Sequence, residues 1–369
     1  MKVGIITRHA ISNYGSLLQS IAMQEAIKKI GHESEIINYI RKDESIGRWE
    51  LTTLSTNDRW NKNAITRLIY LLLRYIPSLV EGMTFQKYRK QKLCLTREYS
   101  SCEELRQNPP IEDIYMTGSD QVWGNIACGD FDDTYLLSFV DDKKKVSYAA
   151  SFGKIELDES TEATLKKYIK DYKYVSVREK SGRDILNNIN IEADVVLDPT
   201  FLLSQEEWLK YSDIKKSDLS KKYLLVYQIH NGKNLMKYAK EVAKQKGIPI
   251  IRISPSLHQI FRGGKFVWLP TISGFLKYIR NAEIVVTDSF HGTALAINLN
   301  AQFVEVLPNN NTSTRNMCVL EEFGLQDRVV SEYNLLNVAS KEIDYSKVNK
   351  VLADKRELSL TKLKKMIEE

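Results

Sequence analysis

Residues 3–40 read VGIITRHAISNYGSLLQSIAMQEAIKKIGHESEIINYI, and this stretch decides the fold class. Residues 3–7 are predicted to form an apolar strand, and the polar loop 8–16 follows. Between Leu18 and Ile30 apolar residues recur at spacings of three and four, which is typical of an amphipathic helix. Residues 35–40 then return as a strand. A strand, a helix and a strand in this order predict a parallel sheet with a right-handed crossover.

The same alternation restarts in the second half of the chain. Strands are expected at 223–227, 248–253, 283–287 and 303–306, and helices at 234–245, 274–280 and 293–299. We therefore predict an α/β fold with two Rossmann-like domains, 1–205 and 206–345, and a C-terminal helix, 346–369, that packs back on the first domain. Ligands of such sheets bind at the carboxyl ends of the strands, so we expect a cleft between the domains.

Composition and charge favour a soluble globular protein. Hydrophobic residues make up 43% of the 369 residues and charged residues 27%, with a net charge of +6. This small excess suits an anionic ligand or an acidic membrane surface, and it does not by itself indicate nucleic acid as a partner. The N-terminus has no signal-peptide pattern. The longest apolar run, Leu68–Leu73, is far shorter than the ~20 residues that span a bilayer, so we expect a cytoplasmic protein.

Several kinds of site are not supported by the sequence. The cysteines are scattered and are expected to be reduced thiols; they are Cys94, Cys102, Cys128 and Cys318. The five histidines show no H-x-x-x-H spacing, so we predict no metal site. The chain also lacks the glycine-rich G-x-G-x-x-G run of dinucleotide-binding proteins and the G-x-S-x-G turn of hydrolases.

Residues 285–294, VVTDSFHGTA, contain the strongest candidate site. A buried strand leads into a polar turn, and a helix begins at once, so its free N–H groups and dipole can attract a carboxylate or phosphate. His291 lies in or next to the first turn, where it can donate to an anion or carry a proton. In the alternative interpretation, Asp288 and Ser289 only cap the helix and His291 is a hydrogen-bonded core residue.

Three further turns follow strands and carry polar residues. Arg178, in residues 176–181, can clamp a carboxylate or phosphate, although most arginines form ion pairs on the surface. Asp120, in residues 117–123, can act as a base towards a sugar hydroxyl, with Trp123 stacking on the sugar; alternatively Asp120 closes the turn and Trp123 is a core residue. In the loop Asn13-Tyr14-Gly15-Ser16, Gly15 allows close approach of a ligand and Ser16 can cap the helix.

Taken in order, these segments resemble the polysaccharide pyruvyl transferase family. The matching motifs cover roughly residues 3–330, and the order of all six makes the resemblance specific. They are Asn13-Tyr-Gly15 with Leu18-Gln19, Gly118-Ser-Asp-Gln-Val-Trp123, Ser147-Tyr-Ala-Ala-Ser-Phe-Gly153, Ser176-Val-Arg-Glu-Lys-Ser181, Asp198-Pro-Thr-Phe201 and Thr287-Asp-Ser-Phe-His-Gly-Thr293.

The resemblance implies a GT-B arrangement of the two domains and a reaction that moves the enolpyruvyl group of phosphoenolpyruvate onto a sugar as a ketal, without a metal or other cofactor. It implies that Arg178 and His291 bind the charged groups of the donor and that His291 carries a proton. An acidic residue of the N-terminal domain is expected to activate the acceptor, and Asp120 is the candidate. Other substrate-binding residues are expected to be Asn13, Tyr14, Gly15, Asp288, Ser289, Phe290 and Gly292.

Residues 65–92 mix apolar and basic side chains. Because the acceptors of surface-polysaccharide assembly are commonly lipid-linked, this segment raises the hypothesis of peripheral contact with the inner face of the membrane. An ordinary core helix with a solvated basic face is the alternative. Two alternative functions stay open: a nucleotide-sugar glycosyltransferase of the same fold, and a saccharide-binding component of an assembly complex that is not an enzyme.

Overall fold

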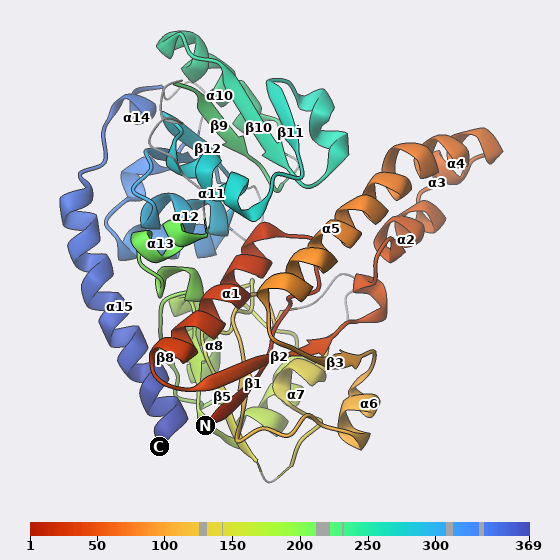
Figure 1. Ribbon diagram of the computed structural model, residues 1–369, viewed down its shortest axis with the longest axis vertical. Helices are drawn as coiled ribbons and strands as arrows, with labels where there is room; N and C mark the ends of the chain where they lie inside the picture. The colour runs from red at the N-terminus through yellow and green to blue at the C-terminus, as the bar shows by residue number, and fades with distance from the viewer. Residues whose placement is uncertain (125–130, 142, 212–221, 231, 308–312, 332–335) are drawn as a thin grey trace. The chain divides into compact units, whose positions relative to one another are not determined.

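The computed structural model describes all residues except 125–130, 142, 212–221, 231, 308–312 and 332–335. The chain divides into two compact units. Unit 1 comprises Met1–Pro199, Ser256–His258 and Ser359–Glu369, and unit 2 comprises Thr200–Pro255 and Gln259–Leu358. Each unit is built on a parallel sheet of its own (Figure 1).

Unit 1 contains a six-stranded sheet in the order β3-β2-β1-β4-β5-β6, and every pair of neighbours is parallel. Its strands are β1 (Lys2–Ile6), β2 (Glu33–Tyr39), β3 (Leu95–Tyr99), β4 (Ile114–Thr117), β5 (Lys144–Ser147) and β6 (Tyr172–Tyr174). The strands β7 (Ser176–Val177) and β8 (Asp194–Val195) form a separate parallel pair. The parallel sheet predicted from residues 3–40 is thus confirmed, whereas β3 is a strand that the sequence pattern did not predict.

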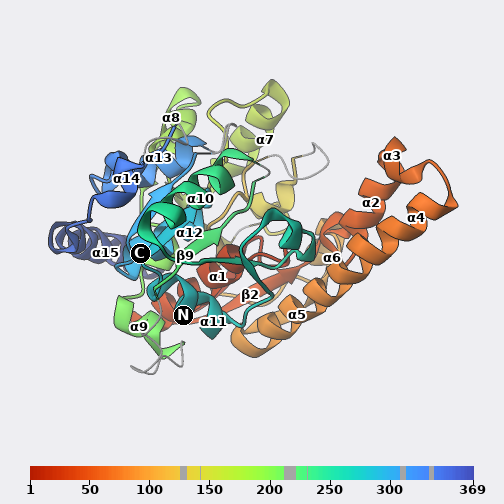
Figure 2. The same ribbon diagram turned by 90° about the horizontal axis from the view of Figure 1, so that it is seen from above.

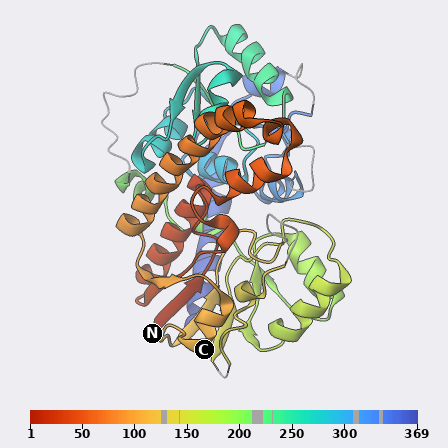
Figure 3. The same ribbon diagram turned by 90° about the vertical axis from the view of Figure 1, so that its right-hand side faces the viewer.

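The helices of unit 1 are α1 (Tyr14–Lys29), α2 (Arg48–Thr56), α3 (Asp58–Asn61), α4 (Ala64–Tyr70), α5 (Ile76–Lys92), α6 (Cys102–Gln107), α7 (Glu159–Ile169) and α8 (Lys180–Asn188). Helix α1 and the yellow-green α7 cover opposite faces of the sheet (Figure 3), as right-handed crossovers on either side of β1 require. The core forms where Leu165 and Ile169 of α7 pack with Ile6, Ile37 and Tyr115 of the strands.

Helix α1 begins earlier than predicted. Asn13 is its N-cap, and the Asn13 side chain accepts hydrogen bonds from the backbone N–H groups of Gly15 at 2.7 Å and Ser16 at 3.4 Å. The prediction that Ser16 caps this helix is therefore wrong. Ser16 lies inside the first turn, because an asparagine in extended conformation is an equally good cap three residues earlier.

Unit 2 contains a five-stranded parallel sheet in the order β11-β10-β9-β12-β13. Its strands are β9 (Leu224–Tyr227), β10 (Ile250–Ser254), β11 (Lys265–Trp268), β12 (Ile284–Thr287) and β13 (Phe303–Glu305). Its helices are α9 (Gln205–Lys210), α10 (Asn234–Lys246), α11 (Ile272–Arg280), α12 (Phe290–Asn298), α13 (Ser313–Glu322) and α14 (Asn337–Ser340). Val226, Val286 and Val304 from three strands pack against α10 in one core, which matches the continuous apolar runs of a parallel sheet.

The last helix, α15 (Tyr345–Glu368), ends in a segment that belongs to unit 1. In this segment the Ser359 hydroxyl accepts from the backbone N–H of Leu197 at 3.1 Å, and Lys362 forms an ion pair with Asp194 at 2.5 Å. Near its end, the backbone carbonyl of Ile367 accepts from Lys144 at 3.0 Å. Residues 359–369 are thus held by β5 and β8 of unit 1.

Two expectations for residues 64–92 are corrected. These residues form one helix of 29 residues, made of α4, the π-helical turn η2 (Leu71–Tyr75) and α5, and it is long and apolar enough to cross a membrane by length and composition alone. The short apolar run Leu68–Leu73 therefore does not exclude a membrane-spanning helix on grounds of length, contrary to the prediction. The helix is also not a core helix, because only 22% of its most apolar window is buried.

Candidate functional site

Polar residues gather at the carboxyl ends of β1 and β4 in unit 1. The strand order reverses between these two neighbouring strands, which makes this edge the topological switch point where such sheets bind ligands. Thr7 and Asn13 follow β1, and Ser119 and Asp120 follow β4. A hydrogen bond of 2.7 Å from the Thr7 hydroxyl to the backbone carbonyl of Ser119 joins the two turns. We call the residues around Asp120 and Arg178 the unit 1 group.

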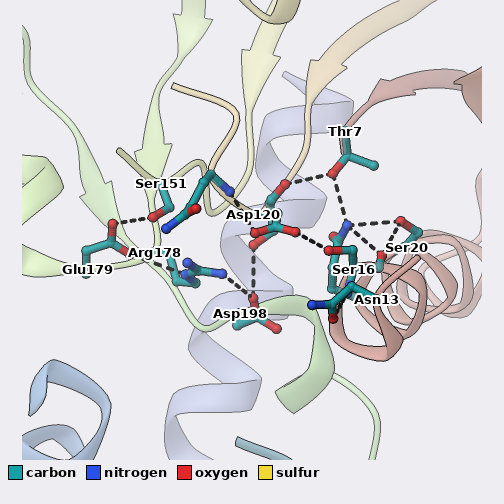
Figure 4. Close-up of polar contacts among 12 residues, drawn as sticks. Thr7, Asn13, Ser16, Ser20, Asp120, Ser151, Arg178, Glu179 and Asp198 are labelled. Atoms are coloured by element: carbon teal, nitrogen blue, oxygen red, sulfur yellow. Dashed lines mark hydrogen bonds and ion pairs between the residues drawn. The ribbon is translucent and has the colours of Figure 1, made fainter. Parts of the chain in front are cut away.

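Asp120 lies at the centre of this group in a strained backbone conformation. Its φ is +76°, in the left-handed region that residues with a side chain seldom adopt, and such strain is typical of functional sites. One carboxylate oxygen accepts from the Ser16 hydroxyl at 2.5 Å and the other from the backbone N–H of Gln121 at 2.8 Å. The turn thus aims a buried carboxylate at the start of α1 (Figure 4).

Arg178 follows β7 and forms ion pairs inside the protein, not on its surface. Its guanidinium donates to Asp198 at 3.1 Å and to Glu179 at 3.2 Å, and Figure 4 shows Arg178 between these two carboxylates. Burial, the largest effect, lowers the pKa of Arg178, but Glu179, Asp198 and Asp120 together outweigh it and raise the pKa. Three carboxylates therefore surround one guanidinium, and the group as a whole does not favour an additional anion.

Hydroxyl groups hold the carboxylates of this group in place. Ser119 donates to Asp198 at 3.0 Å, and Ser151 donates to Glu179 at 2.5 Å. Glu179 was not singled out from the sequence, although it follows Arg178 directly in a quoted motif. Asp198 occurs in another quoted motif, and only the fold shows that its carboxylate reaches the Arg178 guanidinium.

The other predicted residues of unit 1 have structural roles. Tyr14 is fully buried and packs edge-on against Phe85, with ring centroids 5.0 Å apart. Trp123 is also fully buried and packs against Phe152, so the prediction that it is a core residue is confirmed and the stacking role is wrong. Asn13 and Gly15 hydrogen-bond to each other at the start of α1. Substrate binding by Asn13, Tyr14 and Gly15 stays a prediction.

In unit 2 the strand order reverses between β9 and β12, and the predicted turn follows β12. Asp288 does not cap α12. Its two carboxylate oxygens accept from the backbone N–H groups of Ile229 at 2.7 Å and His230 at 3.1 Å, which fixes the loop after β9. Burial raises the pKa of Asp288 to about 6, although these two N–H groups and Arg262 lower it. Asp288 therefore positions the loop that carries His230.

Helix α12 begins at Phe290, three residues earlier than predicted, and Ser289 is its N-cap. The Ser289 hydroxyl accepts from the backbone N–H of Gly292 at 3.2 Å, which confirms the predicted cap. His291 lies in the first turn, is 8% exposed and meets the Phe290 ring edge-on at 5.2 Å. Gly292 is required sterically, because a Cβ there would lie 2.5 Å from the Thr287 hydroxyl.

Three arginines near this turn were missed by the sequence analysis. Arg252 is fully buried and donates to Gln228 at 3.2 Å; burial, and then Arg262, lower its pKa to about 10. Arg262 donates to the backbone carbonyl of His230 at 3.5 Å. Burial, and then Arg315, lower the pKa of His230. The sequence carries no signal for these arginines, because none of them lies in a turn after a strand. Arg252 lies within β10, Arg262 ends the 3₁₀ helix η6 (Leu257–Arg262), and Arg315 lies in α13.

Glu305, at the end of β13, was also missed. It is fully buried and accepts hydrogen bonds from Thr293 and, at 2.5 Å, from Asn316. Burial raises its pKa to about 8, so the side chain holds a proton at neutral pH. We call Asp288, Ser289, His291, Glu305 and the three arginines the unit 2 group. The three arginines of this group outnumber its two carboxylates, Asp288 and Glu305, and burial raises the pKa of both carboxylates.

Among the residues that the structure describes, no cluster of histidine, cysteine, aspartate and glutamate could hold a metal ion. Among the described residues, Cys94, Cys102 and Cys318 form no disulfide bond, and Cys128 lies outside these residues.

A comparison of the sequence with known families decides its relationship. The sequence profile described as polysaccharide pyruvyl transferase matches residues 13–311, which is most of the chain and includes Asp120, Arg178 and the unit 2 group except Arg315. The chain belongs to the polysaccharide pyruvyl transferase family. The resemblance given by the six motifs is thereby confirmed. No curated protein sequence matches the chain.

Solved structures similar to this pyruvyl transferase family member share its fold at low sequence identity. Trehalose-6-phosphate synthase OtsA is 9% identical with a TM-score of 0.54, and the match covers 100% of this chain and 99% of that chain. UGT89C1 from Arabidopsis thaliana, complexed with UDP-L-rhamnose, is 9% identical with a TM-score of 0.52 and coverages of 99% and 98%.

UDP-GlcNAc 2-epimerase from Neisseria meningitidis, bound to UDP-GlcNAc, is 11% identical with a TM-score of 0.50 and coverages of 97% and 94%. These likenesses extend over both units. They confirm the predicted fold class, α/β with two Rossmann-like sheets of the GT-B type. Identities this low concern the fold and carry nothing about the substrate. The cleft between the domains, and the placement of His291 and Arg178 on one ligand, stay predictions.

Proposed function

We propose that this family member transfers the enolpyruvyl group of phosphoenolpyruvate to two hydroxyls of a sugar, forming a cyclic ketal in surface-polysaccharide synthesis. The observation that carries the proposal is the start of α12 at the switch point of unit 2, where His291 lies in the first turn of the helix. Arg252 and Arg262 interact electrostatically with Asp288, which lies directly before this helix and its cap, and Arg315 interacts in the same way with His230. The family supports a saccharide acceptor and a transferase.

The charges of the two groups favour unit 2 as the donor side. Phosphoenolpyruvate carries a carboxylate and a phosphate, and the unit 2 group combines a helix start with Arg252, Arg262 and Arg315. In the unit 1 group the charge of Arg178 already faces three carboxylates. We therefore propose that Arg178 balances the carboxylates around Asp120, and its direct contact with the donor stays a prediction.

The chemistry needs protons to move in both directions. A proton from His291 adds to the methylene carbon of the donor, and the carbon that bears oxygen becomes electrophilic. One sugar hydroxyl attacks that carbon and the carbon–oxygen bond to phosphate breaks. A neighbouring hydroxyl then closes the ketal. Of the two hydroxyl protons, one replaces the proton given by His291 and the other leaves with phosphate. Positive groups that meet the donor stabilise the negative charge on the phosphate as its carbon–oxygen bond breaks.

We propose Asp120 as the base that accepts a proton from the attacking hydroxyl. The Ser16 hydroxyl and the Gln121 N–H orient its carboxylate. The reaction requires Asp120 and His291 to reach the same substrate. Replacing Asp120 with asparagine keeps the size of the side chain and removes the base, so turnover should fall while donor binding persists.

The proposal is tested by incubating the protein with phosphoenolpyruvate and a panel of lipid-linked oligosaccharides. We expect phosphate release that depends on the acceptor, and mass spectrometry should show one acceptor with the added mass of a pyruvyl ketal. Stabilisation by a UDP-sugar and not by phosphoenolpyruvate in a thermal-shift assay would instead indicate a glycosyltransferase. Binding of an oligosaccharide with no phosphate release from any acceptor would indicate a saccharide-binding protein.

A further inference from the structure

The helix formed by residues 64–92 exposes apolar side chains along one face. Six of them are about half exposed or more, and Ile65, at 70%, is the most exposed of these. We call this set the apolar stripe: Ile65, Leu68, Leu72, Leu73, Ile76 and Met83. Their spacing of mostly three and four places them on one side of a helix. Such a row of exposed apolar side chains marks an interaction surface.

The opposite face of the same helix packs on unit 1. Arg74 pairs with Glu50 of α2 at 3.1 Å, and the Tyr70 hydroxyl also donates to Glu50. Further along, Phe85 packs against Tyr14, and Arg89 donates to the backbone carbonyl of Ala10 at 2.7 Å. Figure 2 shows α4 and α5 extending beside α2, away from the sheet of unit 1. Because one face is bound to the protein, the helix cannot be surrounded by lipid as a membrane-spanning helix is.

The charges near the apolar stripe are almost all positive. Lys62 precedes the stripe by three residues, and Lys87 and Lys90 follow Met83 by four and seven residues on the same face; all three are exposed. Between residues 48 and 92 the only carboxylate on an exposed residue belongs to Asp58. The stripe therefore suits a partner that is apolar in its middle and negative at its edge.

A second copy of the chain fits this surface poorly. In a two-fold symmetric pair of stripes, an antiparallel arrangement places Lys62 of each copy near Lys87 and Lys90 of the other. A parallel arrangement places each lysine next to its own counterpart. Like charges meet in both cases, which disfavours a self-complementary interface.

We propose that the apolar stripe docks on the surface of an anionic bilayer, with the helix lying in the plane of the interface. The apolar side chains would enter the acyl boundary and the flanking lysines would meet anionic headgroups. The stripe is separate from both polar groups, so this proposal does not rest on the identity of the donor. Two basic residues of the segment 65–92, Arg74 and Arg89, bind within the protein, so the apolar stripe and the flanking lysines form the proposed contact surface.

Vesicle co-sedimentation of the full chain tests the proposal. The wild type should sediment with vesicles of phosphatidylglycerol and phosphatidylcholine, and much less with phosphatidylcholine alone. The triple substitution of Leu68, Leu72 and Ile76 by glutamine should abolish sedimentation with both. Because these side chains are exposed, this variant should keep the wild-type melting temperature and the wild-type rate of phosphate release with a water-soluble acceptor.

A charge variant and a matched control distinguish attraction between the flanking lysines and the headgroups from an effect of the protein's net charge. Replacing Lys62, Lys87 and Lys90 with glutamate should weaken binding to anionic vesicles on the order of 100-fold, because each lysine near the surface contributes about fivefold. The same change at Lys237, Lys240 and Lys244, three exposed lysines of α10, should leave binding unchanged.

Two results would overturn the proposal. One is co-sedimentation with anionic vesicles that is the same for the wild type, the glutamine variant of the stripe and the glutamate variant of the flanking lysines. The other is a wild-type dimer without vesicles that becomes monomeric on glutamine substitution, as measured by analytical ultracentrifugation, because the stripe would then be an interface between copies. Failure of phosphoenolpyruvate turnover with normal vesicle binding would count against the proposed function alone.

Discussion

At the scale of single residues, His291 is the group on which the proposed chemistry depends most. It lies in the first turn of α12, where a donor bound by the helix start would be within reach. We expect His291→Ala to lower the rate of phosphate release about 100-fold or more, with little change in donor affinity, because a lost acid–base group affects the transition state. The control for loss of a histidine elsewhere is His32→Ala, which removes an ion pair with Glu368 in unit 1 and should leave the rate of phosphate release unchanged.

Phosphate release by His291→Ala at the wild-type rate would remove this residue from the mechanism. A matched loss in kcat and in melting temperature would indicate a structural role instead, so both quantities are measured on the same preparation.

Glu305 should make stability depend on pH. Its pKa is raised from 4.5 to about 8 by burial, so between these values the folded state holds a proton that the unfolded chain has lost. The free energy of unfolding therefore falls as the pH rises through this window. We expect Glu305→Gln to melt a few degrees or more above the wild type at about pH 9 and close to it near pH 5, with exposed Glu321→Gln as the control. Parallel melting curves for the three proteins would contradict this.

The sequence predicted individual site residues unevenly. Ser289 was identified as a cap because its type and its place after an apolar strand suffice. Glu305 and Arg252 were missed, since a glutamate at a strand end and an arginine within a strand look like surface residues until the fold buries them. Asp288 was found, but its bonds to Ile229 and His230 depend on a neighbouring strand that is distant in sequence.

At the scale of elements, the start of α12 can be compared with that of α11. Each helix has a hydroxyl N-cap, Ser289 or Thr271, that accepts from a glycine N–H three residues later, Gly292 or Gly274. A Cβ on Gly292 would lie 2.5 Å from the Thr287 hydroxyl and 2.9 Å from the Tyr227 ring, whereas on Gly274 its nearest neighbour is the exposed Thr271 hydroxyl at 3.2 Å.

We therefore expect Gly292→Ala to lower the melting temperature and to abolish phosphate release, because the turn that holds His291 must shift. Gly274→Ala should be neutral or stabilising, since alanine favours a helix by up to about 1 kcal/mol over glycine. Equal melting temperatures for the two variants, measured by calorimetry, would show that the turn at Gly292 is not tightly packed.

Element positions were predictable where periodicity was strong. The parallel strands around β1 and β9 and the helix α10 follow from apolar patterns. The strands β3 and β11 were missed, because edge strands are short and partly exposed. The starts of α1 and α12 were each placed too late, because first turns with polar residues, at Tyr14 and at Phe290, resemble loops in sequence.

At the scale of the whole molecule, the fold class and the family were predictable because six motifs occur in a fixed order over both sheets. The exposed helix of residues 64–92 was not, because apolar residues at helical spacing predict burial, and only the packing of Phe85 and Tyr70 shows which face is covered. Composition alone does not distinguish a core helix from one that presents its apolar face outward.

The central claim is that the donor loses phosphate by cleavage of its carbon–oxygen bond. The most direct measurement uses phosphoenolpyruvate with heavy oxygen in the bridge between carbon and phosphorus, an oligosaccharide acceptor, and mass spectrometry of both products. The account predicts that the heavy oxygen leaves in inorganic phosphate and that the acceptor gains a pyruvyl ketal. Heavy oxygen retained in free pyruvate, with an unchanged acceptor, would contradict it.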